Sequence, residues 1–145
     1  MSSIHVDVAD YPKKFKAVIS GPSGDKTVSF GQRSATDRQN DFPHHGSMSR
    51  MAHYLVRHGA TGDVDDEELR PTVAHQQRMA DEFKKSRKED WTASGVGTAG
   101  FWSRWFLWSF RDLDRVKRQI KRVVPSIRDV YVSPRAERRF YAAGY

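Results

Sequence analysis

The feature that most constrains the fold is a dense aromatic segment, Thr98-Ala-Gly-Phe-Trp-Ser-Arg-Trp-Phe-Leu-Trp-Ser-Phe110. It contains three of the four tryptophans and three of the eight phenylalanines of the chain. At the 3.6-residue period of an α-helix, its apolar side chains cover well over half of the circumference, and Arg104 is left outside that arc. A helix that is apolar nearly all round is usually buried on several sides. We therefore expect this segment to be a central helix.

The large side chains of the aromatic segment and its arginine are the expected structural or interface anchors. They are Phe101, Trp102, Arg104, Trp105, Phe106 and Trp108. Each aromatic side chain can bury roughly 150–250 Å², and aromatic residues and arginine are the types that contribute most to binding at interfaces. Two alternatives stay open: these residues form the core of the domain, or they form a face that binds a neighbouring protein.

Length and composition limit the class of protein. A chain of 145 residues can form one domain with its own core. It has no cysteine, which excludes disulfides, thiolate nucleophiles and cysteine-ligated zinc. No apolar run approaches the roughly 20 residues of a membrane-spanning helix.

Positive charge is concentrated in the second half of the chain. Residues 1–83 carry 10 basic and 12 acidic side chains, whereas residues 84–145 carry 15 and 6, a net charge of +9. The basic residues expected to contact a polyanion are Arg115, Lys117, Arg118, Lys121, Arg122, Arg135, Arg138 and Arg139. Such a distribution favours contact with nucleic acid, lipid headgroups or an acidic protein, and the alternative is a solubilising helix surface.

The pattern along the chain predicts a small single α+β domain, with an N-terminal β-hairpin packed on several helices around the Trp-rich helix. Residues 1–14 read as an N-terminal arm, residues 15–132 as the domain, and residues 133–145 as a basic C-terminal tail. Two β-prone runs flank a turn at residues 21–26 and form the hairpin. Helices are expected after the capping residues Ser47 or Ser49, Thr98 and Asp112, and after Pro71, with a short strand at 127–132.

One short motif suggests catalysis. Arg57-His58-Gly59 resembles the signature of the histidine phosphatase and phosphoglycerate mutase superfamily, in which the histidine is the phosphorylated nucleophile. That signature follows a parallel strand and requires a second, downstream histidine, and no histidine follows His75 here. We therefore expect a protein that is not an enzyme, with the phosphatase as a remote alternative. The other histidines lack the spacing of a zinc site, so neither metal nor cofactor is expected.

A second resemblance involves the aromatic segment itself. Asp90-Trp91 followed by Gly97-Thr-Ala-Gly-Phe-Trp-Ser-Arg-Trp-Phe-Leu-Trp108 resembles an uncharacterised family of large double-stranded DNA viruses of algae and protists. Val28-Ser-Phe-Gly31 and the segment with Arg50, Tyr54 and Arg57-His58-Gly59 are further parts of that resemblance. This chain differs by what looks like an insertion at residues 62–88 and by a longer basic tail.

The resemblance implies a non-enzymatic structural component of a virus particle, most simply a minor capsid or cementing protein. Its implied partners are the major capsid protein and other minor capsid proteins, with nonspecific contact to DNA or inner-membrane headgroups and without a small-molecule substrate. The implied location is the virion, on the inner face of the capsid shell, and the host cytoplasm during assembly. The alternative is a nonspecific DNA-associated virion or replication-accessory protein.

Overall fold

A four-stranded mixed sheet forms one side of the molecule. The computed structural model describes residues 2–33, 41–64 and 70–141. The strands are β1 (Ser2–Val8), β2 (Lys13–Gly21), β3 (Gly24–Gln32) and β4 (Ile127–Val132). Their order is β3-β2-β1-β4, in which β1 and β4 are parallel and the other pairs are antiparallel. The fold is therefore α+β, as predicted, and β2 and β3 form the expected hairpin.

Helices make up most of the rest of the described chain. Their bounds are α1 (Phe42–His45), α2 (Met48–Arg57), α3 (Val73–Glu82), the 3-10 helix η1 (Ala93–Gly95), α4 (Ala99–Trp102), the π-helix η2 (Ser103–Leu107), α5 (Leu113–Val123) and α6 (Pro134–Tyr141). The predicted caps are formed: the side chains of Ser47, Thr98 and Asp112 accept hydrogen bonds from backbone N–H groups in the first turns of α2, α4 and α5.

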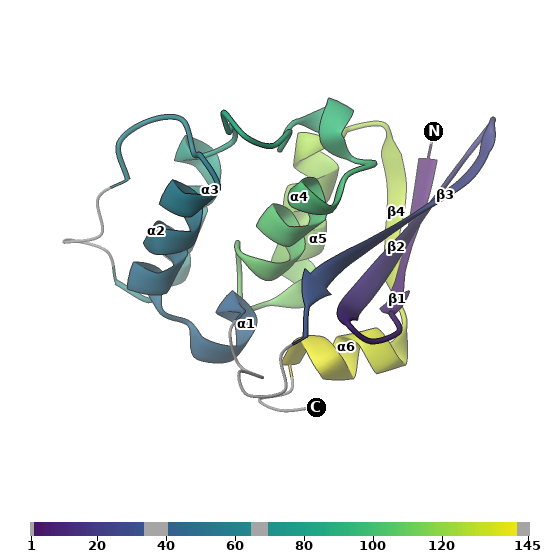
Figure 1. Cartoon of the computed structure of the whole chain (residues 1–145), viewed down its shortest axis with the longest axis horizontal. Helices are drawn as coiled ribbons and strands as arrows, with labels where there is room; N and C mark the ends of the chain where they lie inside the picture. Colours follow the sequence, from purple (N-terminus) through teal and green to yellow (C-terminus); the bar gives the residue numbers. More distant parts are fainter. Residues whose placement is uncertain (1, 34–40, 65–69, 142–145) are drawn as a thin grey trace.

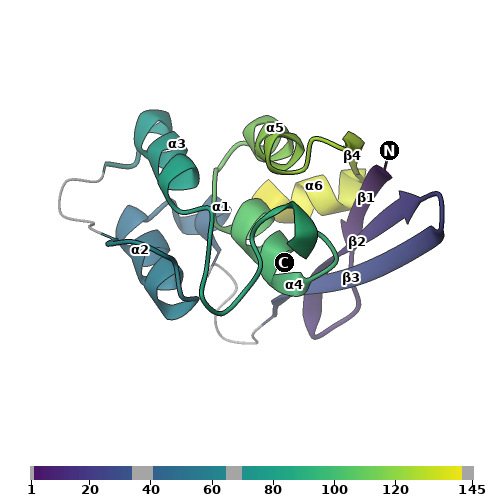
Figure 2. The same ribbon diagram turned by 90° about the horizontal axis from the view of Figure 1, so that it is seen from above.

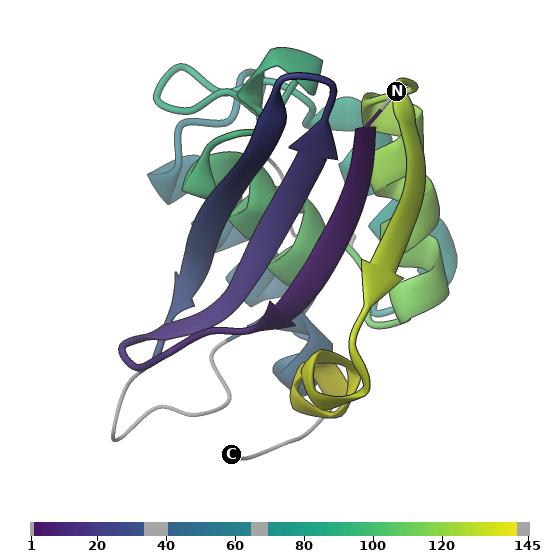
Figure 3. The ribbon, with the colours of Figure 1, turned by 90° about the vertical axis from the view of Figure 1, so that its right-hand side faces the viewer.

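The elements are arranged in layers. The helices α4 and α5 lie against one face of the sheet, and α2 and α3 lie beyond them on the side away from the strands (Figures 1 and 2). Figure 3 shows the other face of the sheet, which no helix of the described chain covers, and shows α6 across one end of the strands. The aromatic segment therefore lies between the sheet and a second layer of helices, which explains why its side chains are apolar nearly all round.

Ring contacts join the aromatic segment to both neighbouring layers. Toward the sheet, the ring centroid of Phe106 lies 5.0 Å from that of Phe15 and 5.5 Å from that of Phe30. Toward α2, Trp108 stacks on Tyr54 with their centroids 4.5 Å apart and their planes 6° apart. Such aromatic contacts stabilise a core beyond the area they bury. The central position predicted for the Trp-rich helix is thus the observed one.

Arg104 differs from the prediction, which left it outside the apolar arc. Its side chain is completely buried and donates to the backbone carbonyls of Met79, Phe83 and Trp108. The guanidinium also lies 4.5 Å from the ring centroid of Trp105. The reason is local: Arg104 belongs to the π-helix η2, where the hydrogen bonds span five residues, so the 100° spacing of an α-helix does not hold. Burial lowers the pKa of Arg104 to about 10, which leaves it charged at neutral pH.

The segment expected to be an N-terminal arm contains an inner strand of the sheet. Residues 2–8 form β1, which pairs with β2 on one side and β4 on the other. Ile4 and Val6 are buried and alternate with the more exposed Ser3 and His5. This period of two is typical of a strand with one covered face. Residues 2–8 therefore belong to the domain and do not form an arm outside it.

The expected basic tail also belongs to the domain. Residues 134–141 form α6, whose Ala136 and Phe140 are buried, and the ring of Phe140 lies 5.2 Å from that of Phe106. Within the expected insertion at residues 62–88, the structure describes α3, which contributes Met79 and Ala80 to the core. The part of that insertion at residues 65–69, and the tail residues 142–145, lie outside the described residues.

Candidate polyanion-binding surface

The six expected anchors lie in the interior of the domain. Their exposed fractions are 8% for Trp108 and 0% for Phe101, Trp102, Arg104, Trp105 and Phe106. Side chains this deeply buried stabilise the domain itself and give a neighbouring protein no surface to contact in the folded chain. Of the two alternatives for these residues, the structure matches the core and not the interface.

The basic residues of α5 divide into two sets. Arg115, Arg118 and Arg122 are spaced i, i+3 and i+7, so they form one row along the helix. Arg118 and Arg122 are exposed. Arg115 is half-buried and forms an ion pair with Asp112, with Nε and Oδ2 3.7 Å apart. Lys117 and Lys121 lie on α5 outside this row. The apolar side of the helix faces the core, which turns the arginine row toward the surface.

Two adjoining hollows follow the arginine row between α5, α3 and the segment after α3. The larger has a volume of about 250 Å³ and is lined by Lys84, Lys85, Trp91, Thr92, Ala93, Gln119, Arg122 and Val123. The smaller, of about 90 Å³, is lined by Gln77, Arg115, Arg118, Gln119 and Arg122. We refer to Lys84, Lys85, Arg115, Arg118, Gln119 and Arg122 together as the basic groove. No acidic residue of the described chain lines either hollow.

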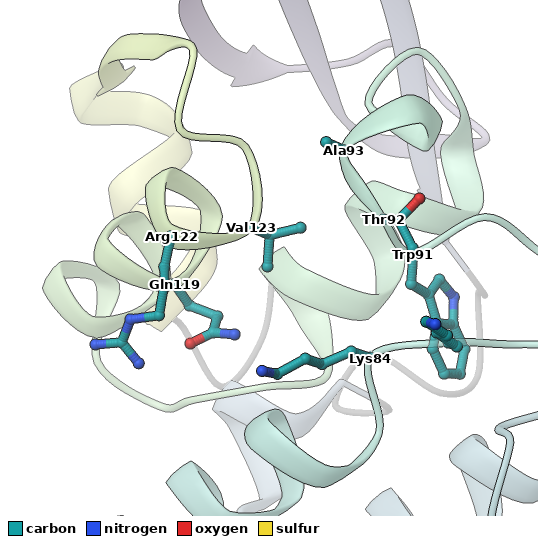
Figure 4. A pocket seen from close by; sticks show the side chains of 8 residues that line it. Lys84, Trp91, Thr92, Ala93, Gln119, Arg122 and Val123 are labelled. Atoms are coloured by element: carbon teal, nitrogen blue, oxygen red, sulfur yellow. The ribbon is translucent and has the colours of Figure 1, made fainter.

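Gln119 lies in the wall shared by both hollows. The residue is 2% exposed, and its amide nitrogen and oxygen have no hydrogen-bond partner among the described residues. Figure 4 shows the side chains of Gln119 and Lys84 pointing toward one another across the larger hollow. Leaving a buried polar group unpaired costs about 1–3 kcal/mol. The amide is therefore part of the wall between the two hollows, and its polar atoms are covered in this conformation.

The sequence interpretation did not include Lys84, Lys85 or Gln119. The two lysines follow the end of α3 at Glu82, where the chain changes direction, so no helical period relates them to α5. The one signal for them was the basic run Lys84-Lys-Ser-Arg-Lys88 itself. Gln119 gave no signal, because a glutamine next to the apolar side of a helix is indistinguishable in sequence from a surface residue.

The arginines of α6 lie apart from the basic groove, at the end of the sheet (Figure 3). Arg139 is half-buried and donates to the backbone carbonyl of Lys14 over 2.8 Å, so it holds α6 to β2. Arg135 lies near Asp7. The pKa of the Asp7 carboxyl is lowered mainly by a hydrogen bond from Ser133, and the positive charge of Arg135 lowers it further by a smaller amount. Arg138 is exposed. The structure therefore does not unite α5 and α6 into one basic stripe.

The histidine of the phosphatase-like motif lies at the end of a helix. Arg57 is the last residue of α2 and His58 is its C-cap, whereas the phosphatase signature follows a strand. The His58 Nδ1 atom lies 3.2 Å from Oε2 of Glu89, and the His58 ring stacks on Tyr54 at 4.2 Å. Across the described chain, no group of three His, Asp or Glu residues is arranged to hold a metal ion. Among the same residues, no helix is both long and apolar enough to cross a bilayer.

Comparison with known proteins gives one partial match. A family of unknown function, DUF5754, matches residues 9–58, a region that spans β2, β3, α1 and α2 but not the aromatic segment. No curated protein and no solved structure matches the chain.

Proposed function

We propose that the protein is a non-enzymatic DNA-binding component of a virus particle, which contacts the phosphate backbone through the basic groove. The observation that carries this proposal is a row of arginines along hollows that no described acidic side chain lines. Guanidinium groups bind phosphate oxygens in a bidentate manner.

The spacing of the arginines suits a regular polyanion. Arg115 and Arg122 are seven positions apart, and a rise of about 1.5 Å per residue puts their backbones roughly 10 Å apart. Phosphates along one strand of B-DNA rise by about 3.4 Å per nucleotide along the axis of the duplex. A row aligned with that axis therefore extends over about three phosphate steps, and Lys84 and Lys85 add positive charge on the other side of the groove.

The chemistry favours nonspecific binding. Phosphate contacts position a protein on DNA but carry no sequence information, and reading sequence requires contacts to base edges. Nonspecific affinities are typically about 10⁻⁴ to 10⁻⁶ M at physiological salt. We expect an affinity in this range, with little preference between duplexes of different sequence.

The proposal that the protein is part of a virus particle rests on the resemblance of residues 90–91 and 97–108 to the viral family. The capsid or cementing role is a weaker proposal after the structure, because the aromatic side chains expected to contact coat proteins fill the core of the domain. Mass spectrometry of purified particles tests the setting, with localisation to shell or core. Absence of the protein from the particles would refute the virion role. DNA binding would then be tested separately, with the purified protein.

Fluorescence anisotropy with a labelled DNA duplex tests the binding surface. The groove variant combines Lys84→Gln, Arg118→Gln and Arg122→Gln. The control combines Lys26→Gln, Arg50→Gln and Arg87→Gln, which remove the same charge from exposed positions that line neither hollow. Circular dichroism checks that each variant is folded.

We expect the groove variant to bind the duplex at least about tenfold more weakly than the wild type, since each phosphate contact contributes to the affinity. The control should lose much less. Equal losses in both variants would mean that total charge, and not the groove, determines binding. A folded wild-type protein that does not bind the duplex at low salt would refute the proposal.

A further inference from the structure

We propose that a second cavity, between α2, β3 and the aromatic segment, binds a small organic carboxylate with a flat apolar body. Its volume is about 310 Å³, near the lower end of the range of about 300–1,000 Å³ for small-ligand sites. It shares no lining residue with the basic groove. The two proposals are therefore independent.

Tyr54 provides a buried donor in the wall of this cavity. Its ring is stacked between Trp108 and His58, at 4.5 Å and 4.2 Å, so the side chain is held in place. The residue is 3% exposed, and its hydroxyl has no hydrogen-bond partner among the described residues. Burial raises the pKa of Tyr54 above its ordinary value, which keeps the phenol neutral and able to donate. A ligand oxygen would satisfy it.

The charges around the cavity favour an anion. Arg57 and Lys13 both line it. Asp41, the acidic residue among the described lining residues, forms a buried ion pair with Lys14, with Nζ and Oδ2 2.5 Å apart. The negative charge of Asp41 is thus balanced. Glu89, whose carboxylate lies 3.2 Å from His58, offsets one further positive charge, so one of the two charges of Arg57 and Lys13 remains in excess.

The remaining wall is apolar, and this limits the kind of anion. Phe30, Leu107 and Trp108 line the cavity beside the polar groups. A phosphate dianion would lose more hydration here than two cations return, because burying charge is costly without full pairing. A monoanionic carboxylate costs less, and an aromatic or flat aliphatic body would pack on the apolar side. In this proposal Arg57 supplies positive charge to the ligand and His58 stacks on Tyr54, so the two residues serve binding and not catalysis.

Isothermal titration calorimetry of the full chain tests this assignment, with sodium phenylacetate as the probe. Phenylacetamide tests the need for the negative charge, and inorganic phosphate tests the need for the apolar body. The site variants are Tyr54→Phe, which removes only the hydroxyl, and Arg57→Gln. The control is Arg50→Gln, on the same helix but outside the cavity lining.

We expect saturable binding of phenylacetate, weakened at least about fivefold by each site variant because each removes a hydrogen-bond donor, and unchanged in Arg50→Gln. Phenylacetamide and phosphate should bind at least about tenfold more weakly than phenylacetate, since a charge-assisted contact is the stronger one. The proposal is overturned if the folded wild type gives no saturable binding of phenylacetate. Equal affinity for the acid and the amide, tighter binding of phosphate, or an unchanged affinity in both site variants would also overturn it.

Discussion

Replacing Arg104 with methionine tests how the aromatic core is held together. The guanidinium donates to three buried carbonyls, two of them in or next to the last turn of α3 and one at Trp108. A methionine side chain has a similar length and would fill the space between the indole rings. It would leave the carbonyls of Phe83 and Trp108 without their donor, whereas the Met79 carbonyl would keep its hydrogen bond from the Phe83 N–H. The end of α3 would lose its connection to the aromatic segment.

The expected magnitude follows from these contacts. Each buried acceptor left unpaired costs about 1–3 kcal/mol, which sums to about 4 kcal/mol for the two carbonyls. The substitution also removes the penalty of burying a charge, which returns about 2 kcal/mol. The net loss of unfolding free energy is then about 2 kcal/mol, or a fall in Tm of about 7 °C for a domain of this size.

Urea denaturation followed by circular dichroism measures this loss. Arg118→Met is the matched control, because the same substitution on the exposed side of α5 should change stability by less than about 0.5 kcal/mol. Arg104→Lys should lie between the two, since one ammonium group does not reach three carbonyls at once. An Arg104→Met protein as stable as the wild type would refute the reasoning, because the hydrogen bonds would then do no more than offset the cost of burying the charge.

Three further substitutions give sharp expectations. Gln119→Met should raise the unfolding free energy by about 1 kcal/mol, because it removes an unpaired buried amide. A loss of stability in urea would contradict this. Burial raises the pKa of Tyr54 above its ordinary value of 10.0, so above pH 10 the unfolded chain binds fewer protons than the native chain. The unfolding free energy of the wild type should therefore fall above pH 10 by up to about 1.4 kcal/mol per pH unit relative to that of Tyr54→Phe. If urea unfolding gave the same pH dependence for both proteins, this prediction would be wrong. Gly95→Ala would place a Cβ atom 1.8 Å from the Asp90 carbonyl oxygen. Thermal unfolding should therefore show a loss of unfolding free energy of about 3 kcal/mol. An unchanged Tm would contradict this, because the loop would then have adjusted to the new side chain.

The sequence predicted the elements whose signals are local. Turn residues marked the hairpin, and Ser47, Thr98 and Asp112 marked the starts of helices, because a cap depends on residues within one turn. The apolar arc of the aromatic segment predicted its burial, since it reflects neighbours on several sides. What the arc could not reveal was the change to a π-helix at Ser103, which turns Arg104 inward.

Features that depend on tertiary pairing were not predictable. Residues 2–8 carry Ile4, Val6 and Val8 in alternation, a local strand signal that the expectation of an arm missed. Their place as an inner strand was not predictable, because it depends on pairing with β4 from the far end of the chain. The basic groove shows the same limit. The arginine row was visible in the helical period of α5, but Lys84 and Lys85 join it only because the chain after α3 passes beside that helix.

The salt dependence of DNA binding tests the central claim most directly. Each phosphate contact contributes about 0.9 to the slope of log Kobs against log salt concentration. Arg115 is already paired with Asp112, so the other four cations of the groove predict a wild-type slope of about −3.6. Removing three of them in the Lys84, Arg118 and Arg122 variant should reduce the steepness by about 2.7, whereas the Lys26, Arg50 and Arg87 variant should keep nearly the wild-type slope. Equal slopes for the two variants would contradict the assignment of the groove as the DNA-binding surface.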